Sequence, residues 1–426
     1  MTVSSNPDKE AYGNFLGNRW VQLITAVISM IMIANLQYAW TLFSTPLRDQ
    51  FKVSLAAIQY GFTLFIMFET FVQPVGGYLL DRFGARLMFT LAGLMVGTGW
   101  AMIGQVQSIS GLYFFYSLAG VGAAIIYGGS ISVAVRWFPD RRGMASGLIA
   151  AGFGMGSLPF LPIISSLLKS GGPSLALMST GIVQGLIILV AAQILRYPVS
   201  FKRPANNSGK QEASKPAAAQ GFKFNEMLLT PHFWLLWIMF LSVNIGGLLI
   251  TAQTRPFGQS IHISSAAILL AVAVQNLTNG SGRLIWGWIS DKLGRYTTMG
   301  VSFGLNALFL FLLPHVAHSD ATYILMTALI IGTWGQCFSL FPAANADVFG
   351  TTYAATNYGF LYSAKGFASI FGGGLGAYLA HSYGWTTVFS AAAGFSLFAA
   401  LTSLVLPRIP KPVKPGLKAD TTQAQA

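Results

Sequence analysis

The chain has 426 residues, of which 54% are hydrophobic and only 9% are charged, and its mean hydropathy is +0.59. Soluble domains carry roughly 25% charged residues, so this composition excludes an ordinary soluble domain and indicates an integral membrane protein. The formal charge of +13 does not predict a nucleic-acid partner, because Lys and Arg lie in short segments between apolar stretches. The single cysteine, Cys337, excludes a disulfide within the chain and a cysteine metal site.

Twelve stretches, each of about 19–27 residues, are apolar and long enough to cross a bilayer once as a helix. We therefore predict an all-α integral membrane fold with 12 transmembrane helices. In chain order the predicted spans are roughly 20–43, 56–80, 87–106, 110–135, 144–167, 173–195, 232–254, 264–290, 297–315, 322–345, 357–380 and 385–406.

A polar segment divides these spans into two groups of six. Residues 197–226 contain Pro, Ser, Asn, Ala and Lys with no apolar period, which predicts a flexible linker. The predicted parts are a cytoplasmic N-terminal segment (1–19), an N-terminal six-helix half (20–195), a cytoplasmic linker (196–231), a C-terminal six-helix half (232–406) and a cytoplasmic tail (407–426). Both termini are placed in the cytoplasm because only Arg48, Lys52, Lys169 and Arg255 fall in the predicted outer loops.

The two halves repeat a short motif at the end of their second span. GYLLDRFG at 77–84 recurs as GWISDKLG at 287–294. A parallel repeat of two six-helix halves implies a twofold axis along the membrane normal, with a binding site between the halves near the midplane.

Two cations lie inside predicted spans. Arg283 precedes Asp291 by eight residues and Lys365 follows Asn357 by eight, so helix rise places both about 12 Å from the inner surface. A charge at that depth costs on the order of 2.5–3.5 kcal/mol, and snorkelling, the alternative reading, works near helix ends. The only acid inside the spans is Glu69. This imbalance predicts a small dicarboxylate ligand, because Arg can hold one carboxylate in a fork while Lys holds the other.

Aromatic and amide side chains stand near the middle of the same spans. Such walls predict a narrow pocket that excludes water and bulky anions, although any single member is equally well explained by helix packing. The set comprises Gln37, Tyr38, Tyr127, Phe153, Trp334, Phe338 and Tyr362.

The motif at 77–84 looks like the signature between helices two and three of the major facilitator superfamily, and RWFPDRRG at 136–143 fits its loop between helices four and five. More narrowly, most of the chain from Gly17 to Pro412 resembles the oxalate:formate antiporter family of bacteria. The stretches that carry this resemblance are GNRW at 17–20, LQYAWTLF at 36–43, SLAAIQ at 54–59, RWFPDRRGMASG at 136–147, LPFLPIISSLLK at 158–169, NIGGLL at 244–249 and FASIFGGGLGA at 367–377.

The resemblance implies a binding site. That family binds its dianion with an arginine in helix eight and a lysine in helix eleven, which match Arg283 and Lys365. Its aromatic cage matches Gln37, Tyr38, Tyr127, Trp334 and Tyr362. This sequence departs from the pattern at Phe153 and Phe338, where tyrosines are expected, and at Glu69, where an uncharged residue is expected.

The sequence leaves three roles open for Glu69. It could pair with Lys365 or another cation in the empty site, remain neutral, or bind a proton during transport. In monocarboxylate:proton symporters an aspartate stands four residues before the helix-eight arginine, whereas Asn279 stands there in this sequence.

Charged residues at the predicted cytoplasmic ends of the spans are assigned to gating rather than to substrate contact. We expect them to form ion-pair latches that break when the inner side opens. They are Asp81, Arg82, Arg86, Asp291 and Arg295.

The resemblance implies a secondary transporter that exchanges small carboxylates, oxalate inward for formate outward, by alternating access in the cell inner membrane. In that case each cycle moves one net negative charge. The alternative is a proton-coupled symporter of monocarboxylates such as lactate, with Glu69 as the coupling group. No nucleotide loop, metal cluster or nucleophile paired with a base is evident in the spans, so we expect no catalytic residue, metal or cofactor. The expected partners are small carboxylates and lipid, and the expected state is a monomer.

Overall fold

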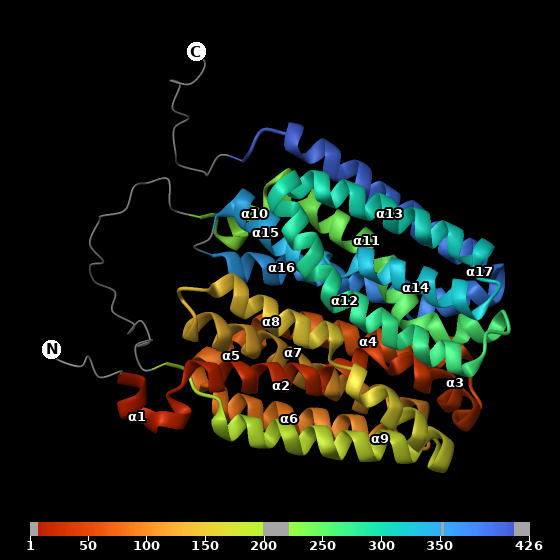
Figure 1. The fold of residues 1–426 in the computed structure, drawn as a ribbon, viewed down its shortest axis with the longest axis horizontal. Helices are drawn as coiled ribbons and strands as arrows, with labels where there is room; N and C mark the ends of the chain where they lie inside the picture. Colours follow the sequence, from red (N-terminus) through yellow and green to blue (C-terminus); the bar gives the residue numbers. More distant parts are fainter. Residues whose placement is uncertain (1–6, 199–220, 351–352, 413–426) are drawn as a thin grey trace.

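The computed structural model describes residues 7–198, 221–350 and 353–412, and helices are the regular elements of these ranges. Figure 1 shows the helices of the N-terminal half in the lower part of the molecule and those of the C-terminal half above them. The N-terminal half comprises α1 (Pro7–Leu16), α2 (Arg19–Tyr38), α3 (Trp40–Phe51), α4 (Leu55–Phe71), α5 (Gln73–Phe83), α6 (Ala85–Ile103), α7 (Ile109–Trp137), α8 (Arg142–Met155), the 3-10 turn η1 (Leu158–Phe160) and α9 (Leu161–Ile194). The C-terminal half comprises α10 (Phe224–Leu228), α11 (Pro231–Ser260), α12 (Ser265–Leu293), α13 (Arg295–Val316), α14 (Asp320–Trp334), α15 (Cys337–Phe349), α16 (Ala354–Gly372), α17 (Gly374–Val405) and the turn η3 (Leu406–Arg408).

Several predicted spans are broken helices rather than straight ones. The first span breaks at Ala39 between α2 and α3, the second bends by 48° between α4 and α5, and the tenth breaks between α14 and α15. Conversely, the fifth and sixth spans join through non-helical residues inside α9, where Gly172 has φ 70. A glycine adopts this left-handed conformation without the steric cost that a side chain would add, so the chain can reverse there.

The end of the predicted linker is folded. Phe222 is buried and its N–H donates to the Phe349 carbonyl, while the Asn357 amide donates to the Phe222 carbonyl. The short helix α10 follows. This part of the linker is therefore fastened to the C-terminal half, and the rest of the predicted flexible stretch, 199–220, lies outside the described residues.

The two halves meet through several pairs of helices, including α4 with α17 and α3 with α11. Helix α4 also packs against α16, and α8 packs against α12. At the second crossing the backbones approach so closely that a Cβ added to Gly154 would lie 3.0 Å from the Gly280 Cα atom. Because α2 packs against α8, these two crossings gather α2, α4, α8, α12 and α16 around the middle of the molecule.

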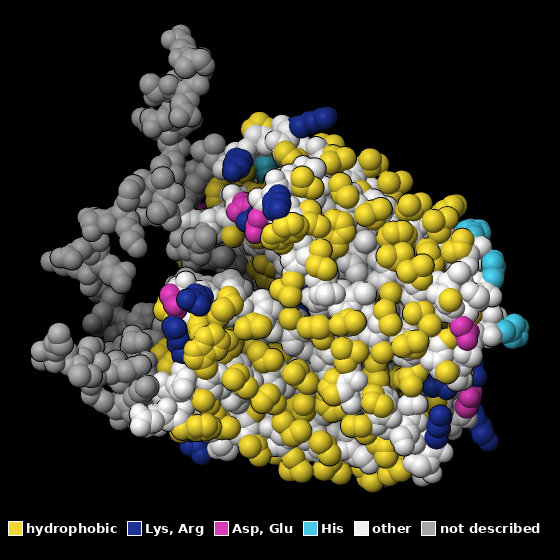
Figure 2. All heavy atoms as spheres, in the orientation of Figure 1, with side chains coloured by type: hydrophobic (Ala, Val, Ile, Leu, Met, Phe, Trp, Pro, Cys, Tyr) yellow, Lys and Arg dark blue, Asp and Glu magenta, His cyan; other side chains and the backbone are white. Residues whose placement is uncertain are grey.

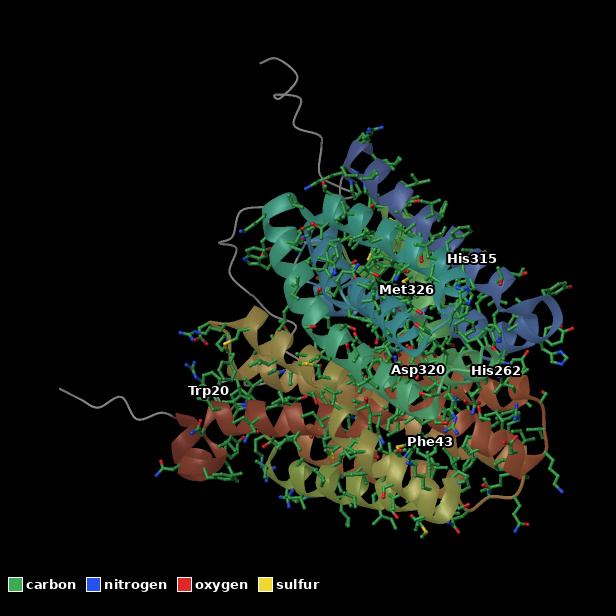
Figure 3. All side chains as sticks on the ribbon, turned by 45° about the vertical axis from the view of Figure 1, so that its right-hand side comes forward. Trp20, Phe43, His262, His315, Asp320 and Met326 are labelled. Atoms are coloured by element: carbon green, nitrogen blue, oxygen red, sulfur yellow. The ribbon has the colours of Figure 1, made fainter. Side chains whose placement is uncertain are left out.

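The surface is that of a protein embedded in lipid. Figure 2 shows hydrophobic side chains covering the flank of the helices, whereas Lys, Arg, Asp and Glu gather at two ends. We call these the α1 end and the α3 end, after the helices that lie there in Figure 1. In Figure 3, Trp20 lies toward the α1 end and His262 and His315 toward the α3 end. In the described ranges eight helical segments are long and apolar enough to cross a membrane, or nine if the bent pair α4–α5 is one span.

Candidate functional site

Lys365, on α16, is completely buried and has three hydrogen-bond partners. Its Nζ atom donates to the Glu69 Oε2 atom at 2.7 Å, the Gln37 Oε1 atom at 3.1 Å and the Tyr362 hydroxyl at 3.2 Å. An ammonium group has three donors, so all of them are engaged. Two of the partners, Gln37 on α2 and Glu69 on α4, belong to the other half of the protein.

Glu69 is also completely buried, and its ion pair with Lys365 joins the halves at the α4–α16 crossing. Of the roles that the sequence left open, pairing with Lys365 is the one this structure displays. The second carboxylate oxygen, Oε1, is buried without a hydrogen-bond partner in the structure. Removing one member of such a pair costs about 3–5 kcal/mol, because the other charge is left buried and uncompensated.

Arg283, on α12, is buried but less completely satisfied. Its Nη1 atom donates to the Ala150 carbonyl of α8 at 2.9 Å, while Nη2 lies 3.4 Å from both the Tyr38 hydroxyl and the Asn279 Oδ1 atom. The Nε atom is buried with no partner. Arg283 therefore retains unused donor capacity inside a buried site. Asn279 was noted in the sequence only for its place before Arg283, and its contact with the guanidinium follows from the four-residue spacing on one helix face.

The Phe338 ring lies close to both cations. Its centroid lies 4.9 Å from the Arg283 Cζ atom and 5.6 Å from the Lys365 Nζ atom. The two cations can thus be no farther apart than the sum of these distances. Cation–π contacts of this kind contribute about 2 kcal/mol when desolvated, so the phenylalanine helps to hold two like charges near each other.

The other predicted aromatic residues close the site around these groups. The Phe153 ring lies 5.2 Å from the rings of both Tyr38 and Tyr127, and Tyr127 lies 6.0 Å from Tyr362. All four side chains are buried. Helices α2, α7, α8 and α16 thus each contribute one ring to a single aromatic cluster.

Trp334 contacts this cluster through Phe338. Its ring packs 5.3 Å from Phe338, and its indole N–H donates to the Asn244 Oδ1 atom of α11. The donor is therefore engaged by the protein, and Trp334 supports the Phe338 ring. Asn244 was missed as a site residue because nothing in its local sequence distinguishes it from other buried amides.

The predicted gate residues lie at the α1 end, where the following contacts join three of them to partners in the same half. Arg136 pairs with Asp81, Arg295 pairs with Asp347, and the Arg86 Nε atom donates to the Gln193 Oε1 atom. Arg82 lies over the Phe83 ring, and Asp291 is exposed at the end of α12. The partners Arg136, Gln193 and Asp347 were not anticipated. The gating role of the five predicted residues remains a prediction.

At the α3 end the halves are fastened to each other. The Gln59 Nε2 atom donates to the Ala252 carbonyl, the Thr63 hydroxyl donates to the Ser369 carbonyl, and Thr45 donates to Gln259. In this structure the α3 end is therefore bridged by polar contacts between the halves.

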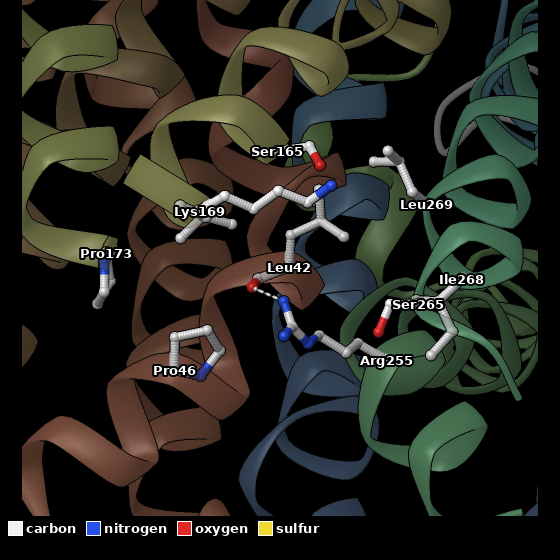
Figure 4. Close-up of a pocket in the computed structure, with 10 residues that line it drawn as sticks. Leu42, Pro46, Ser165, Lys169, Pro173, Arg255, Ser265, Ile268 and Leu269 are labelled. Carbon is white, nitrogen blue, oxygen red and sulfur yellow. Dashed lines mark hydrogen bonds between the residues drawn. The ribbon is translucent and has the colours of Figure 1, made fainter. Parts of the chain in front are cut away.

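A basic cavity of about 240 Å³ lies beside these contacts. Figure 4 shows Lys169 of α9 and Arg255 of α11 reaching toward it from opposite halves, with the guanidinium bonded to the Leu42 carbonyl. Its lining comprises Leu42, Pro46, Ser165, Leu168, Lys169, Pro173, Arg255, Ser265, Ile268 and Leu269.

Comparison with known proteins identifies the family to which this architecture belongs. A family model described as the Major Facilitator Superfamily matches residues 23–259 and 243–425. The oxalate:formate antiporter of Oxalobacter formigenes is 47% identical over 418 residues, which are 97% of this chain and 98% of that protein. The chain belongs to the oxalate:formate antiporter family of the major facilitator superfamily. The uncharacterized MFS-type transporter YhjX of Escherichia coli K12 is 26% identical over 361 residues, covering 84% of this chain and 87% of that one.

A solved structure has the same fold. The crystal structure of a bacterial homologue of the human lysosomal transporter Spinster, inward-facing and unoccupied, aligns with a TM-score of 0.67 at 17% identity, over 92% of this chain and 97% of that one. The predicted family and the all-helical major facilitator fold are confirmed. This family member is a multi-pass membrane transporter and not an enzyme.

Proposed function

We propose that this transporter exchanges small carboxylates by alternating access, taking up oxalate and releasing formate, with Arg283 and Lys365 as the anion-binding groups. The observation that carries the proposal is the pair of buried cations that both contact the Phe338 ring, at 4.9 and 5.6 Å from its centroid. A dianion with its two carboxylates back to back can bridge two cations that lie near one ring, and the surrounding aromatic side chains favour a small one. The relative that is 47% identical is named an oxalate:formate antiporter, which supports the same substrates.

The proposed topology is 12 spans with both termini in the cytoplasm of a bacterial inner membrane. Two of the eight apolar segments, 144–194 and 356–408, have 51 and 53 residues. At 1.5 Å rise each would extend roughly 75–80 Å, which is enough for two crossings of a hydrocarbon core about 30 Å thick. With these two divided, with α4–α5 counted as one span and with α12 added, the total is twelve. Buried polar side chains such as Gln275, Asn276 and Arg283 lower the hydropathy of α12.

In this topology the α1 end faces the cytoplasm and the α3 end faces outward. The cross-half contacts of Gln59, Thr63 and Arg255 then close the outer side. Opening that side requires these contacts to break, while the predicted residues at the α1 end close the inner side in turn. We keep the proposed division of the chain at 20–195 and 232–406, because the exchange motion is a rotation of these halves about the central site.

Proton-coupled symport of a monocarboxylate is the rival function, and one observation favours it. Glu69 is a buried acid whose pair with Lys365 joins the halves. A proton on Glu69 would break that pair without any second anion. The absence of an acid at Asn279 and the family membership favour exchange.

Uptake of labelled oxalate into proteoliposomes separates the two functions. Vesicles are loaded with formate, with oxalate or with neither, at equal pH on both sides. We expect uptake only into the loaded vesicles. Rapid uptake of lactate into unloaded vesicles, driven by an imposed pH gradient, would instead establish the symporter. Failure of oxalate uptake under every load would overturn the proposed substrate.

A further inference from the structure

The basic cavity at the α3 end is lined by side chains from both halves of the protein. Its two cations are Lys169 of the N-terminal half and Arg255 of the C-terminal half, and Figure 4 shows both of them extending toward it. Among the described residues neither side chain forms an ion pair. The cavity of about 240 Å³ has room for about eight water molecules at roughly 30 Å³ each, so a small anion fits with part of its hydration shell.

The orientation of Arg255 follows from a proline in α3. Pro46 has no backbone N–H, so the carbonyl of Leu42, four residues earlier, lacks the donor that a regular helix supplies. The Arg255 Nη1 atom donates to this carbonyl from the other half, and the Arg255 backbone N–H donates to the Thr41 hydroxyl. A guanidinium group has five donors, and within the described ranges only Nη1 donates to a protein atom. The other donors therefore remain free for a ligand in the cavity.

Two acids of the described residues lie near this cavity, and both are engaged elsewhere. Asp49, which attracts Arg255, accepts two hydrogen bonds from the neighbouring arginine of α3. Asp320 accepts hydrogen bonds from the backbone N–H and the hydroxyl of Ser264. The first residue of α12, Ser265, lines the cavity, and the N-terminus of a long helix favours a nearby anion. The cavity is therefore electropositive.

The two cations belong to different halves, which makes an anion between them a link across the interface. Without an anion, their like charges oppose closure of the α3 end. A small oxyanion offsets this repulsion, because one of its oxygens can accept from the Lys169 ammonium and another from the free donors of Arg255. Both cations face one cavity only while the α3 end is closed, since rotation of the halves separates them. A ligand that binds the closed conformation more tightly shifts the population toward it.

We propose that this cavity is a second anion site, separate from Arg283 and Lys365, and that a small oxyanion bound between Lys169 and Arg255 holds the α3 end closed. The ligand class is a small anion with at least two acceptor oxygens. The inference goes beyond the proposed function: it uses the rotation of the halves but does not depend on which carboxylate the central site carries. In the topology proposed above, the concentration of external oxyanions then sets the share of molecules that open outward.

Calorimetric titration with sulfate, at constant ionic strength set by potassium chloride, tests whether the site exists. We expect the wild type to bind about one sulfate here, and Lys169→Gln to bind it about 5- to 10-fold more weakly. Lys169 is exposed, so this variant should fold. Lys52→Gln is the matched control, because Lys52 is an exposed lysine at the α3 end outside the lining of the cavity. No sulfate binding by the wild type, or equal binding by Lys169→Gln, would overturn the inference.

Spin-label distances test whether the bound anion closes the α3 end. The labels are attached to Gln105→Cys in the N-terminal half and His318→Cys in the C-terminal half, at exposed positions beyond the ends of α6 and α13. Thr63→Val is added because it removes a contact between the halves and so populates the open state. Sulfate should enlarge the short-distance population more than chloride at the same ionic strength, since chloride only screens the repulsion. An equal effect of chloride would overturn the inference.

Two comparisons separate this site from the central one. Arg283→Lys should bind sulfate as the wild type does, since it changes the central site alone. Sulfate binding that is lost in Arg283→Lys but kept in Lys169→Gln would assign the anion to the central site and overturn the inference. Oxalate–formate exchange is measured on the same samples. Exchange without sulfate binding at Lys169 would overturn this inference alone, whereas sulfate binding without exchange would overturn the proposed substrates and leave the second site standing.

Discussion

The substitution Arg283→Lys separates the geometry of the site from its charge. Lysine keeps the positive charge but lacks the planar fork, and it also lacks the Nε donor that is free in the wild type. Oxalate would then lose at least one charge-assisted hydrogen bond, which contributes about 1.5–3 kcal/mol. At about 1.4 kcal/mol for each factor of ten, the dissociation constant should rise by about 10- to 150-fold.

The assay is calorimetric titration of purified Arg283→Lys with oxalate, together with the concentration dependence of oxalate uptake. Arg48→Lys is the matched control, since Arg48 is exposed and pairs with its neighbour Asp49. The control should bind oxalate as the wild type does, and both variants should retain their thermal midpoint. Unchanged affinity in Arg283→Lys would refute the reasoning, because charge alone would then suffice at this position.

Three further predictions concern the contacts between the halves. Lys365→Gln should lower stability by about 3–5 kcal/mol, seen as a lower thermal midpoint, because Glu69 is left buried without its cation; adding Glu69→Gln should restore most of the loss but not oxalate binding. Gly154→Ala should slow exchange, because its Cβ would lie 3.0 Å from the backbone of α12, whereas Gly147→Ala on the same helix meets nothing within 4 Å and should exchange normally. Arg255→Gln removes the 2.6 Å bond to a carbonyl of α3 and should widen the distances between spin labels placed across the α3 end.

A double variant no more stable than Lys365→Gln would show that the carboxylate is not what destabilises the single variant. Equal exchange rates for the two glycine variants would mean that the crossing of α8 and α12 is looser than the structure indicates. Unchanged spin-label distances in Arg255→Gln would show that this arginine does not help to close the outer side.

The sequence predicted that Arg283 and Lys365 lie at one level, and the structure brings both close to Phe338, but their pairings could not be predicted. Arg283 lies eight residues before Asp291, near the end of α12, and Lys365 lies eight residues after Asn357, near the start of α16, so helix rise places both at a similar level. That spacing says nothing about how α12 and α16 are rotated about their axes. The bond from Lys365 to Glu69 depends on the α4–α16 crossing, which only the packing of the two halves determines.

The partners of the charged residues at the helix ends could not be predicted for the same reason. Asp81 and Arg295 were placed correctly at one end of the molecule, but their partners Arg136 and Asp347 come from helices distant in sequence. The break at Ala39 between α2 and α3 was also missed. The predicted span 20–43 runs through Ala39, so its hydropathy does not mark where α2 ends and α3 begins.

Equilibrium titration of the purified protein with oxalate and with oxamate tests the central claim most directly, namely that two buried cations hold the two carboxylates of one small dianion. Oxamate has almost the same planar shape but carries an amide in place of one carboxylate. The wild type should bind oxalate more tightly than oxamate by about 10- to 100-fold, because one charge-assisted bond becomes a neutral one. Equal affinity for the two ligands would contradict the account, since only one of the cations would then take part in binding.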